Sequence, residues 1–578
     1  MLSTRQMGLH LLHVVLLQCT CVCLAAVGHS CNFDQVMRSS GPPAVVREVA
    51  QRRQGAWQAY TAAAPGWEPI RIKVFTEDLK NELRYCTAEG QERPNFVGRN
   101  VTCNASDILT ADKKALLIDQ LLPEAIKLHS DRLLVVPENV IVVRRFVVSA
   151  CVYFTIPSDH RDPGVSGADM VLYAAAGPTV GENAAWSLFC STLTSGRPSV
   201  GVINFGPQHI AANRVVIRAA AHEIAHALGF SAYLFAEQGM ISRVEGLRGK
   251  TTAFVVSSKK TLQATRKHFN CSTAPGMELE DEGDEGTALS HWKRRNAKDE
   301  LMAGVASVGF YSALTMSAFE DTGLYKANWG MEELMSWGNN TGCSFIRDKC
   351  MTNNITDYPD MFCNGSSGVP RCTSDRLYLG FCDIVVYNEA LKPQYQYFAN
   401  ASFGGSAVQM TDYCPVITPA KDAGCTNNLN TLPGSRVGPT SRCLKGESLS
   451  IERNAIGDVC VEVACNSSDT LQVRYHGDDT WHHCPEGSSV TPGAPFTDGR
   501  IICPRYSDVC PTLACPAGGG ACSSGNDASE GAPGGDGDNA SFHKNQSSQG
   551  SDGALSAFIP VPLLVFVLGI CSMLFTSG

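Results

Sequence analysis

The stretch His222-Glu-Ile-Ala-His-Ala-Leu-Gly229 constrains the fold of this chain most strongly, because its chemistry requires a helix. The residues before it, 215–221, are mostly aliphatic or alanine and favour that helix. Four residues separate His222 from His226, so both side chains project from one face, about one turn apart. Two imidazoles with this spacing can share one metal ion, and Glu223 can hold a water without ligating the metal.

A zinc ion is the metal that this pattern favours. Zinc lowers the pKa of a coordinated water from about 15.7 to about 7, and a carboxylate then takes a proton as the water attacks a peptide carbonyl. The alternative is that these are ordinary polar residues on a helix. That alternative does not explain why two histidines and a glutamate interrupt an alanine-rich segment. The motif therefore predicts one catalytic Zn2+, with His222 and His226 as ligands and Glu223 as the general base.

The residues after the motif determine which class of zinc site this is. Gly229 suits a left-handed helix end, which would turn the chain away from the metal. In the short metzincin pattern a third histidine would fall at position 232, where this chain has Ala232. The third ligand must therefore lie further along the chain, or the site is not of the metzincin class.

Three residues are candidates for the third ligand. Glu245 has about the spacing of zinc peptidases whose third ligand is a glutamate on a later helix, whereas His268 lies in a basic, surface-like stretch. His291 is followed 11 residues later by Met302. A methionine on a tight turn after the third histidine forms the floor of a metzincin site. The residues favour His291, and Glu245 is the main alternative.

The cysteines indicate an exported protein. The chain has 25 Cys, and the 20 from Cys86 to Cys522 form an even set that predicts a disulfide framework of up to ten bridges. A net charge of -9 without a basic block argues against nucleic acid as a partner. Acceptor sites for N-glycosylation agree with export, among them Asn100, Asn104, Asn270, Asn339, Asn354, Asn364, Asn400 and Asn466.

The first 65 residues look like processing segments. Residues 1–28 carry Arg5 and then an apolar run, which is typical of a secretory signal peptide. Residues 29–65 have little periodicity and read as a pro-segment. Cys31 stands there alone, and its thiolate could occupy the open zinc position and keep a precursor inactive. The residues leave open the alternative that Cys31 joins the disulfide set.

From residue 66 the chain alternates between strand and helix patterns. Apolar residues alternate over 70–74 as in a strand, and residues 110–134 read as a helix with Thr110 as its N-cap and a kink at Pro123. We expect an α+β catalytic unit in which a few strands carry the zinc-site helix across one face. Further β-rich runs lie at 145–156, 170–175 and 200–205.

Two later stretches differ in composition from the catalytic part. Residues 278–285 are acidic, and we expect a solvated surface loop there, with steering of basic substrates as the alternative. Residues 351–515 are rich in Cys, Gly and Pro with short apolar runs such as 377–386. They predict a disulfide-stapled, mainly β C-terminal domain.

The C-terminal end predicts a lipid anchor. Residues 516–553 are rich in Gly, Ser and Asp and read as a flexible stalk. Residues 554–578 form an apolar tail with no basic residue after it, which argues against a transmembrane anchor. Small residues at 550–553 followed by this tail fit a GPI signal.

Several blocks of the sequence resemble leishmanolysin, the major surface metalloprotease of kinetoplastid parasites, which belongs to the metzincin clan. The resemblance runs from about residue 66 to about residue 515. The blocks that carry it are Trp67 to Leu79, His222 to Ser231, Ala288 to Met302, Ala313 to Gly323 and Met335 to Cys343.

This resemblance implies a role for each candidate residue. It assigns His222, His226 and His291 to zinc, Glu223 to catalysis and Met302 to the Met-turn. It also implies a pro-segment cysteine switch at Cys31, although the pro-segment is short for the family. The domains expected are a signal peptide (1–28), a pro-segment with the switch (29–65), an N-terminal catalytic subdomain (66–232), a central subdomain with the third histidine and the Met-turn (233–350), a Cys-rich C-terminal domain (351–515), a stalk (516–553) and a GPI-anchor signal (554–578).

The function expected from these observations is that of a cell-surface zinc metalloendopeptidase held to the membrane by a lipid anchor. Its partners would be protein and peptide substrates, and the resemblance adds adhesion to proteins of the host-cell surface. Two alternatives are an adhesion or decoy glycoprotein with little protease activity, and an aminopeptidase-like enzyme with Glu245 as the third ligand.

Overall fold

The computed structural model describes residues 30–40, 44–45 and 66–510, apart from 148, 180–182, 284–286, 366–367, 427–431 and 466–469. All of these belong to one unit of the chain, residues 1–520. The predicted signal peptide, the stalk and the GPI-anchor signal lie outside the described residues.

A mixed sheet of five strands supports the helix that carries the histidine motif. Its order is β1-β10-β11-β9-β3, in which β11, β9 and β3 run parallel and β10 is antiparallel to β11. Every residue of β9, β10 and β11 is buried, because helices and loops cover both faces. The strands predicted at 170–175 and 200–205 are confirmed, and the one predicted over 70–74 is present as a strand that begins at Ile72. The bounds are β1 (Ala44–Val45), β3 (Ile72–Phe75), β9 (Met170–Ala175), β10 (Ala185–Thr192) and β11 (Pro198–Phe205).

The β-rich prediction for 145–156 is wrong. The described part of this segment contains a short 3-10 helix, Ala150–Tyr153, which begins where the Ser149 side chain accepts a hydrogen bond from the Cys151 amide at 3.1 Å. A disulfide joins Cys151 to Cys190 in β10. Ala150, Cys151 and Phe154 therefore pack against the sheet instead of extending it, while Val147 is exposed.

The helix predicted for 110–134 has the predicted N-cap and is interrupted as predicted, but it ends at Ser130, and Leu133–Val135 form a strand, β6. The Thr110 hydroxyl accepts a hydrogen bond from the Lys113 amide at 3.2 Å. One π-helical turn, Leu117–Leu121, separates α4 (Ala111–Leu116) from α5 (Leu122–Ser130). Pro123 has no N–H to donate to the preceding turn, so the helix is irregular at this point.

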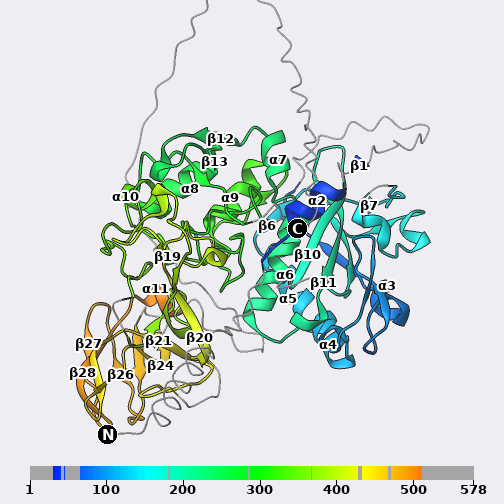
Figure 1. The fold of residues 1–578 in the computed structure, drawn as a ribbon. Helices are drawn as coiled ribbons and strands as arrows, with labels where there is room; N and C mark the ends of the chain where they lie inside the picture. The colour runs from blue at the N-terminus through cyan, green and yellow to red at the C-terminus, as the bar shows by residue number, and fades with distance from the viewer. Residues whose placement is uncertain are drawn as a thin grey trace, which may run out of the picture. The chain divides into compact units, whose positions relative to one another are not determined.

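Helix α6 (Arg214–Ala227) carries the histidine motif and lies against β10 and β11 (Figure 1). Asn213 caps its start by accepting a hydrogen bond from the Val216 amide at 3.0 Å. At its other end Gly229 has a φ of 103°, as expected, and the Phe230 amide donates to the Ala225 carbonyl at 3.0 Å. This is the Schellman geometry that a glycine permits.

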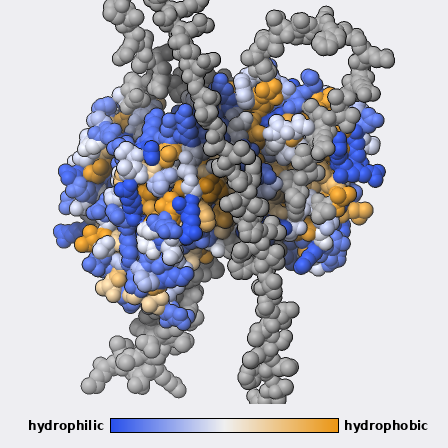
Figure 2. Space-filling model, turned by 90° about the horizontal axis from the view of Figure 1, so that it is seen from above, coloured by the Kyte–Doolittle hydropathy of each residue, from blue (hydrophilic) through white to orange (hydrophobic). Residues whose placement is uncertain are grey.

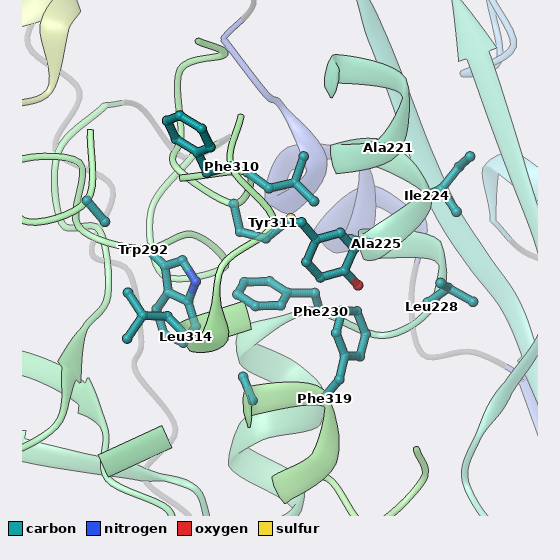
Figure 3. Packing of buried hydrophobic residues seen from close by; sticks show 14 of the residues in the cluster. Ala221, Ile224, Ala225, Leu228, Phe230, Trp292, Phe310, Tyr311, Leu314 and Phe319 are labelled. Carbon is teal, nitrogen blue, oxygen red and sulfur yellow. The ribbon is translucent and has the colours of Figure 1, made fainter. Parts of the chain in front are cut away.

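Aromatic packing fixes α6 against the segments that follow it. Figure 3 shows Ile224 and Ala225 of α6, Leu228 at its C-terminal end, and Phe230, Trp292 and Phe319, which all belong to one hydrophobic cluster. The Phe230 and Trp292 rings meet edge to face with centroids 5.1 Å apart. The remaining helices are α2 (Phe33–Ser40), α3 (Glu77–Lys80), α7 (Ala232–Glu237), α8 (Lys259–Phe269), α9 (Ala313–Asp321), α10 (Cys343–Arg347) and α11 (Tyr506–Val509).

Smaller sheets surround this core. A three-stranded sheet β12-β13-β14 precedes His291, a second three-stranded sheet has the order β15-β6-β2, and two two-stranded ribbons complete the group. The bounds are β2 (Glu68–Pro69), β4 (Glu92–Pro94), β5 (Asn100–Thr102), β6 (Leu133–Val135), β7 (Val140–Ile141), β8 (Val165–Ser166), β12 (Ile241–Val244), β13 (Ala253–Val256), β14 (Met277–Glu278) and β15 (Lys326–Ala327).

The described residues between 351 and 510 are mainly β, as predicted. Two four-stranded sheets, β21-β24-β25-β26 and β23-β22-β28-β27, share a hydrophobic cluster, and β16-β17-β20 and β18-β19 form smaller sheets. The bounds are β16 (Arg371–Cys372), β17 (Tyr378–Cys382), β18 (Ile384–Val386), β19 (Phe403–Gly405), β20 (Ile417–Gly424), β21 (Ser441–Leu444), β22 (Gly446–Ile451), β23 (Asn454–Ala455), β24 (Val459–Cys465), β25 (Leu471–Arg474), β26 (His482–His483), β27 (Ser489–Val490) and β28 (Phe496–Ile502).

The disulfide framework is confirmed for the described cysteines. Eighteen of the 20 predicted residues form nine bridges, while Cys515 and Cys522 lie outside the described residues. The pairs are Cys86–Cys103, Cys151–Cys190, Cys271–Cys343, Cys350–Cys414, Cys363–Cys382, Cys372–Cys443, Cys425–Cys460, Cys465–Cys510 and Cys484–Cys503.

The surface is mixed in character. On the face drawn in Figure 2, hydrophobic residues lie in patches among hydrophilic ones. Exposed apolar side chains include Leu83, Val147, Ile355 and Val408, which come from different parts of the sequence. Among the helices of the described ranges, none has the length and the apolar composition needed to cross a membrane.

Gly229→Ala is expected to destabilise the fold at the end of α6. A Cβ at this position would lie 2.7 Å from Leu234 Cδ2 in a backbone conformation that L-residues rarely adopt. We expect a loss of about 3 kcal/mol in the free energy of unfolding, measured by denaturant titration with disulfides intact. Gly239→Ala is the control, because φ is 64° there but nothing lies within 4 Å of the added Cβ. It should lose about 1 kcal/mol. Equal losses in the two variants would contradict the close contact at Gly229.

Candidate metal centre

Three histidine side chains converge on one point. His222 and His226 come from α6, and His291 comes from the chain segment after β14. Their Nε2 atoms lie 3.1 Å (His222 to His226), 3.1 Å (His226 to His291) and 3.2 Å (His222 to His291) apart. All three rings are buried, and together with the Cys31 Sγ they form a group that could hold a metal ion.

The outer nitrogens of these rings fix their tautomers. Each Nδ1 lies at hydrogen-bonding distance from a backbone carbonyl, which can only accept, so each Nδ1 carries the ring proton. Each Nε2 therefore presents a lone pair to the shared centre. The three pairs are His222 with Leu301 O at 2.6 Å, His226 with Phe230 O at 2.7 Å and His291 with Thr287 O at 2.7 Å.

This donor set fits a zinc ion. Three lone pairs that face one another at 3.1–3.2 Å repel unless a cation lies between them. Tetrahedral zinc with Zn–N distances of about 2.0–2.1 Å places its ligand nitrogens about 3.3 Å apart. The observed spacing is close to that value, and the carbonyl partners supply the outer hydrogen bonds typical of metal-binding histidines.

His291 is presented by a short backbone ladder. The Glu280 amide donates to the His291 carbonyl at 2.9 Å, and the Lys293 amide donates to the Glu278 carbonyl at 2.8 Å. On the same ladder the Leu289 amide donates to the Glu280 carbonyl at 2.9 Å. The chain after α6 therefore returns to the site as an extended hairpin. This hairpin carries His291, and α6 does not have to continue to reach it.

The expectation of a solvated loop at 278–285 is wrong for its first part. Glu278 and Glu280 are fully buried, and residues 284–286 lie outside the described ranges. The Lys293 ammonium lies 2.6 Å from Glu280 and 2.7 Å from Asp281. A buried lysine two residues after His291 therefore draws these acidic side chains inward, because a buried cation needs paired charges.

A residue far along the chain completes this ion cluster. Asp412 lies 2.8 Å from the Lys293 ammonium, 2.8 Å from that of Lys250 and 3.1 Å from the Arg248 guanidinium. The Cys350–Cys414 disulfide holds the segment that contains it. Burial raises the pKa of Glu280 to about 7. The cluster joins the hairpin that carries His291 to a chain segment more than a hundred residues away.

Glu223 and Met302 are both inaccessible to solvent beside the three rings. The backbone carbonyl of Glu223 accepts a hydrogen bond from the Ser187 hydroxyl of β10, which ties the helix to the sheet at this residue. The Met302 carbonyl accepts from the Trp292 amide at 2.9 Å. The turn that carries Met302 therefore lies directly beside the residue that follows His291.

Cys31 is a buried free thiol at this centre. Its Sγ lies 3.5 Å from His226 Nε2. Its amide donates to Gly304 O at 3.3 Å, and its carbonyl accepts from the Thr287 hydroxyl at 3.0 Å. Burial, and then the Glu223 carboxylate that shares a hydrogen bond with it, raise the pKa of the thiol well above its usual range.

The residues after Cys31 hold it in place, and the sequence analysis missed them. The Phe33 ring stacks on the His226 ring with centroids 4.1 Å apart and planes 5° apart. The Asp34 carboxylate accepts hydrogen bonds from the Ser290 hydroxyl at 2.5 Å and from its amide at 3.3 Å. Burial raises the pKa of Asp34 to about 6. In the sequence, only the position of Phe33 and Asp34 next to Cys31 could have indicated that they contact the metal centre.

The two other candidates for a third ligand lie elsewhere. Glu245 is exposed and forms an ion pair with Arg243 at 3.0 Å. His268 Nε2 contacts the Trp337 carbonyl at 2.9 Å. Of the three candidates, the structure brings only His291 to the pair on α6.

A buried ion pair anchors α6 on its other side. The Arg218 guanidinium, one turn before His222, bonds both carboxylate oxygens of Glu333 at 2.5 and 2.7 Å. It also donates to the Gly309 carbonyl at 2.9 Å. Burial opposes the effect, but Arg218 lowers the pKa of Glu333 to about 2.

Comparison with known proteins finds similarity to one family of proteins. A family model described as leishmanolysin matches residues 36–515. The chain is 37% identical to leishmanolysin of Leishmania major over 462 residues, which are 77% of this chain and 76% of that protein. It is 37% identical to a leishmanolysin homolog of Crithidia fasciculata over 462 residues, 77% and 71% of the two chains. It is 26% identical to a leishmanolysin-like peptidase of Caenorhabditis elegans over 451 residues, 61% and 67%.

Replacing Glu333 should change how stability depends on pH. A folded pKa of about 2 against an ordinary value of 4.5 stabilises the fold at pH above 4.5, and this contribution is lost as pH falls towards 2. In denaturant titrations at pH 7, Glu333→Gln should lose about 3 kcal/mol or more. The loss should shrink as pH approaches 2, and the exposed control Glu89→Gln should match wild type throughout. A loss that is the same at every pH would contradict the role of the pair.

Proposed function

The chain belongs to the leishmanolysin family of metallopeptidases, and from this membership we propose that it is a zinc endopeptidase with its metal held by His222, His226 and His291. The observation that carries the proposal is the convergence of three proton-free Nε2 atoms within 3.2 Å of one another. The proposal includes a metzincin layout, in which the segment after residue 233 returns to complete the zinc site. The domain boundaries expected from the sequence are part of the same proposal.

The proposed reaction is hydrolysis of a peptide bond by water. Bound Zn2+ supplies a Lewis acid that polarises the scissile carbonyl and lowers the pKa of the attacking water. Glu223 takes a proton from that water and later gives it to the leaving amine. Its burial favours this role, because a carboxylate shielded from bulk water exchanges protons with the reactants and not with solvent.

Met302 is proposed as the floor of the site. Its side chain is fully buried, and the turn that contains it also supplies the Leu301 carbonyl to His222 Nδ1. A fixed floor restricts the positions that the histidine rings can adopt, which preserves the geometry of their three nitrogens.

Cys31 is proposed as the switch that keeps the unprocessed chain inactive. Its Sγ and the ligand nitrogens of the three histidines all lie within 4.8 Å of one another, so the thiol would take the fourth ligand position that a catalytic water needs. A metal ion at this centre would favour the thiolate, against the effect of burial, because a coordinating thiol is deprotonated. Removal of the pro-segment would take away the thiol together with the Phe33 stack on His226.

Location and partners are also proposals. We infer that the mature enzyme is anchored at the outer cell surface by a lipid, acts on proteins and peptides, and takes part in adhesion to host cells. The anchor signal and the signal peptide lie outside the described residues, so these inferences rest on sequence composition and family membership. An adhesion or decoy role without protease activity is the alternative, and the following experiment separates the two.

Glu223→Ala should abolish cleavage while zinc binding persists. After removal of the pro-segment, we expect at least about a 100-fold loss in kcat/KM on a denatured protein substrate, because a general base contributes about that much or more. A chelator should inactivate the wild type. Glu245→Ala is the control, because its carboxylate is exposed and remote from the three rings. It should keep full activity and one zinc per chain, whereas His291→Ala should lose the zinc.

Two results would overturn this proposal. Cleavage that resists the chelator, or an active Glu223→Ala variant, would exclude the zinc mechanism. A processed wild type that binds zinc but cleaves nothing would favour the adhesion or decoy alternative.

A further inference from the structure

The carboxylate of Glu300 is a buried acceptor beside the metal centre that the proposed reaction does not use. It is 1% exposed. Its Oε2 accepts a hydrogen bond from the Met302 amide at 2.5 Å. Its Oε1 accepts from the Ser312 hydroxyl at 2.8 Å and from the Thr315 hydroxyl at 2.7 Å. One side chain therefore joins the turn of Met302 to the start of α9.

The peptide unit between Leu301 and Met302 is held at both ends. Its N–H, which belongs to Met302, donates to Glu300, and its carbonyl, which belongs to Leu301, accepts from His222 Nδ1 at 2.6 Å. A peptide unit is planar, and its N–H and C=O point in opposite directions. Fixing the N–H direction therefore fixes the direction of the carbonyl that sets the tautomer and the ring position of His222.

The same carboxylate is connected to the third histidine. The Thr315 hydroxyl, which donates to Glu300, accepts from the indole N–H of Trp292 at 2.9 Å. Trp292 directly follows His291, and its amide donates to the Met302 carbonyl at 2.9 Å. The Glu300 carboxylate is thus connected to His222 through the Leu301–Met302 peptide, and to His291 through Thr315 and Trp292.

We propose that Glu300 is a positioning residue for the metal centre, which orients His222 through the Leu301–Met302 peptide and His291 through Thr315 and Trp292. This inference rests on the proposed function as a zinc enzyme. A carboxylate suits the position because both of its oxygens must accept. The Met302 amide donates to Oε2 and the Ser312 amide donates to Oε1 at 3.2 Å, and a backbone amide can only donate. Glutamine would place its NH2 group against one of these two amides, so one of the two connections would be lost.

Two variants test the proposal against a matched control. Glu300→Gln breaks one connection of the carboxylate, and Thr315→Val removes the hydroxyl between Glu300 and Trp292 with almost no change in shape. Thr265→Val is the control, since Thr265 is equally buried and its hydroxyl donates to the Thr261 carbonyl within α8. The two valine variants carry the same chemical change in different places.

The measurement is the dissociation constant for zinc of the full chain, by competition with a chelator, beside thermal unfolding of the metal-free chain. We expect both site variants to bind zinc about 10- to 100-fold more weakly, which is the usual effect of losing an outer hydrogen bond in a metal site. Thr265→Val should keep the wild-type constant within about twofold. Metal-free Thr315→Val and Thr265→Val should unfold at similar temperatures.

Specific outcomes would overturn the inference. Folded Glu300→Gln and Thr315→Val chains with wild-type zinc affinity would exclude the positioning role. So would a loss of affinity of the same size in Thr265→Val, which would show a general effect of stability. A wild-type chain that binds no zinc would overturn the proposed function as well, and it is distinguishable because the failure occurs without any substitution.

Discussion

Three imidazole nitrogens that face one another at 3.1–3.2 Å are the constraint on which the rest of the structure depends. Such an arrangement is unfavourable without a cation, so the fold must hold each ring from outside. It does so with three carbonyls, from Leu301, Phe230 and Thr287. Leu301 lies on the turn that contains Met302. Phe230 follows the helix end at Gly229, and Thr287 lies in the hairpin that carries His291.

The part of the site that lies within one helix could be predicted from the sequence. The spacing of His222 and His226 and the left-handed end at Gly229 are local properties, and the structure has both. The choice of His291 depended on Met302 and on the family resemblance, because 65 residues separate it from His226. The structure brings His291 and Cys31 to the pair on α6, and their roles as ligand and switch stay predictions.

The errors arose where distant residues decide the structure. The acidic residues of 278–282 read as a surface loop because nothing local shows that Lys293, Lys250 and Arg248 meet them inside the protein. The segment 145–156 has the composition of a strand, but a disulfide to β10 holds it against the sheet. Arg248, Lys250 and Cys190 lie 30, 31 and 39 residues from their partners, which is outside the window that a pattern search uses. The strands at 170–175 and 200–205 and the start of the helix at Thr110 depend on local periodicity and capping, and the structure has all three.

We propose that zinc in the unprocessed chain is bound by the three histidine nitrogens and the Cys31 sulfur. The X-ray absorption spectrum at the zinc edge tests this most directly, because sulfur at about 2.3 Å is distinct from nitrogen at about 2.0–2.1 Å. We expect one sulfur and three nitrogens in the wild type, and loss of the sulfur in Cys31→Ser. A zinc-loaded wild type without a sulfur neighbour, or an unchanged Cys31→Ser spectrum, would contradict it.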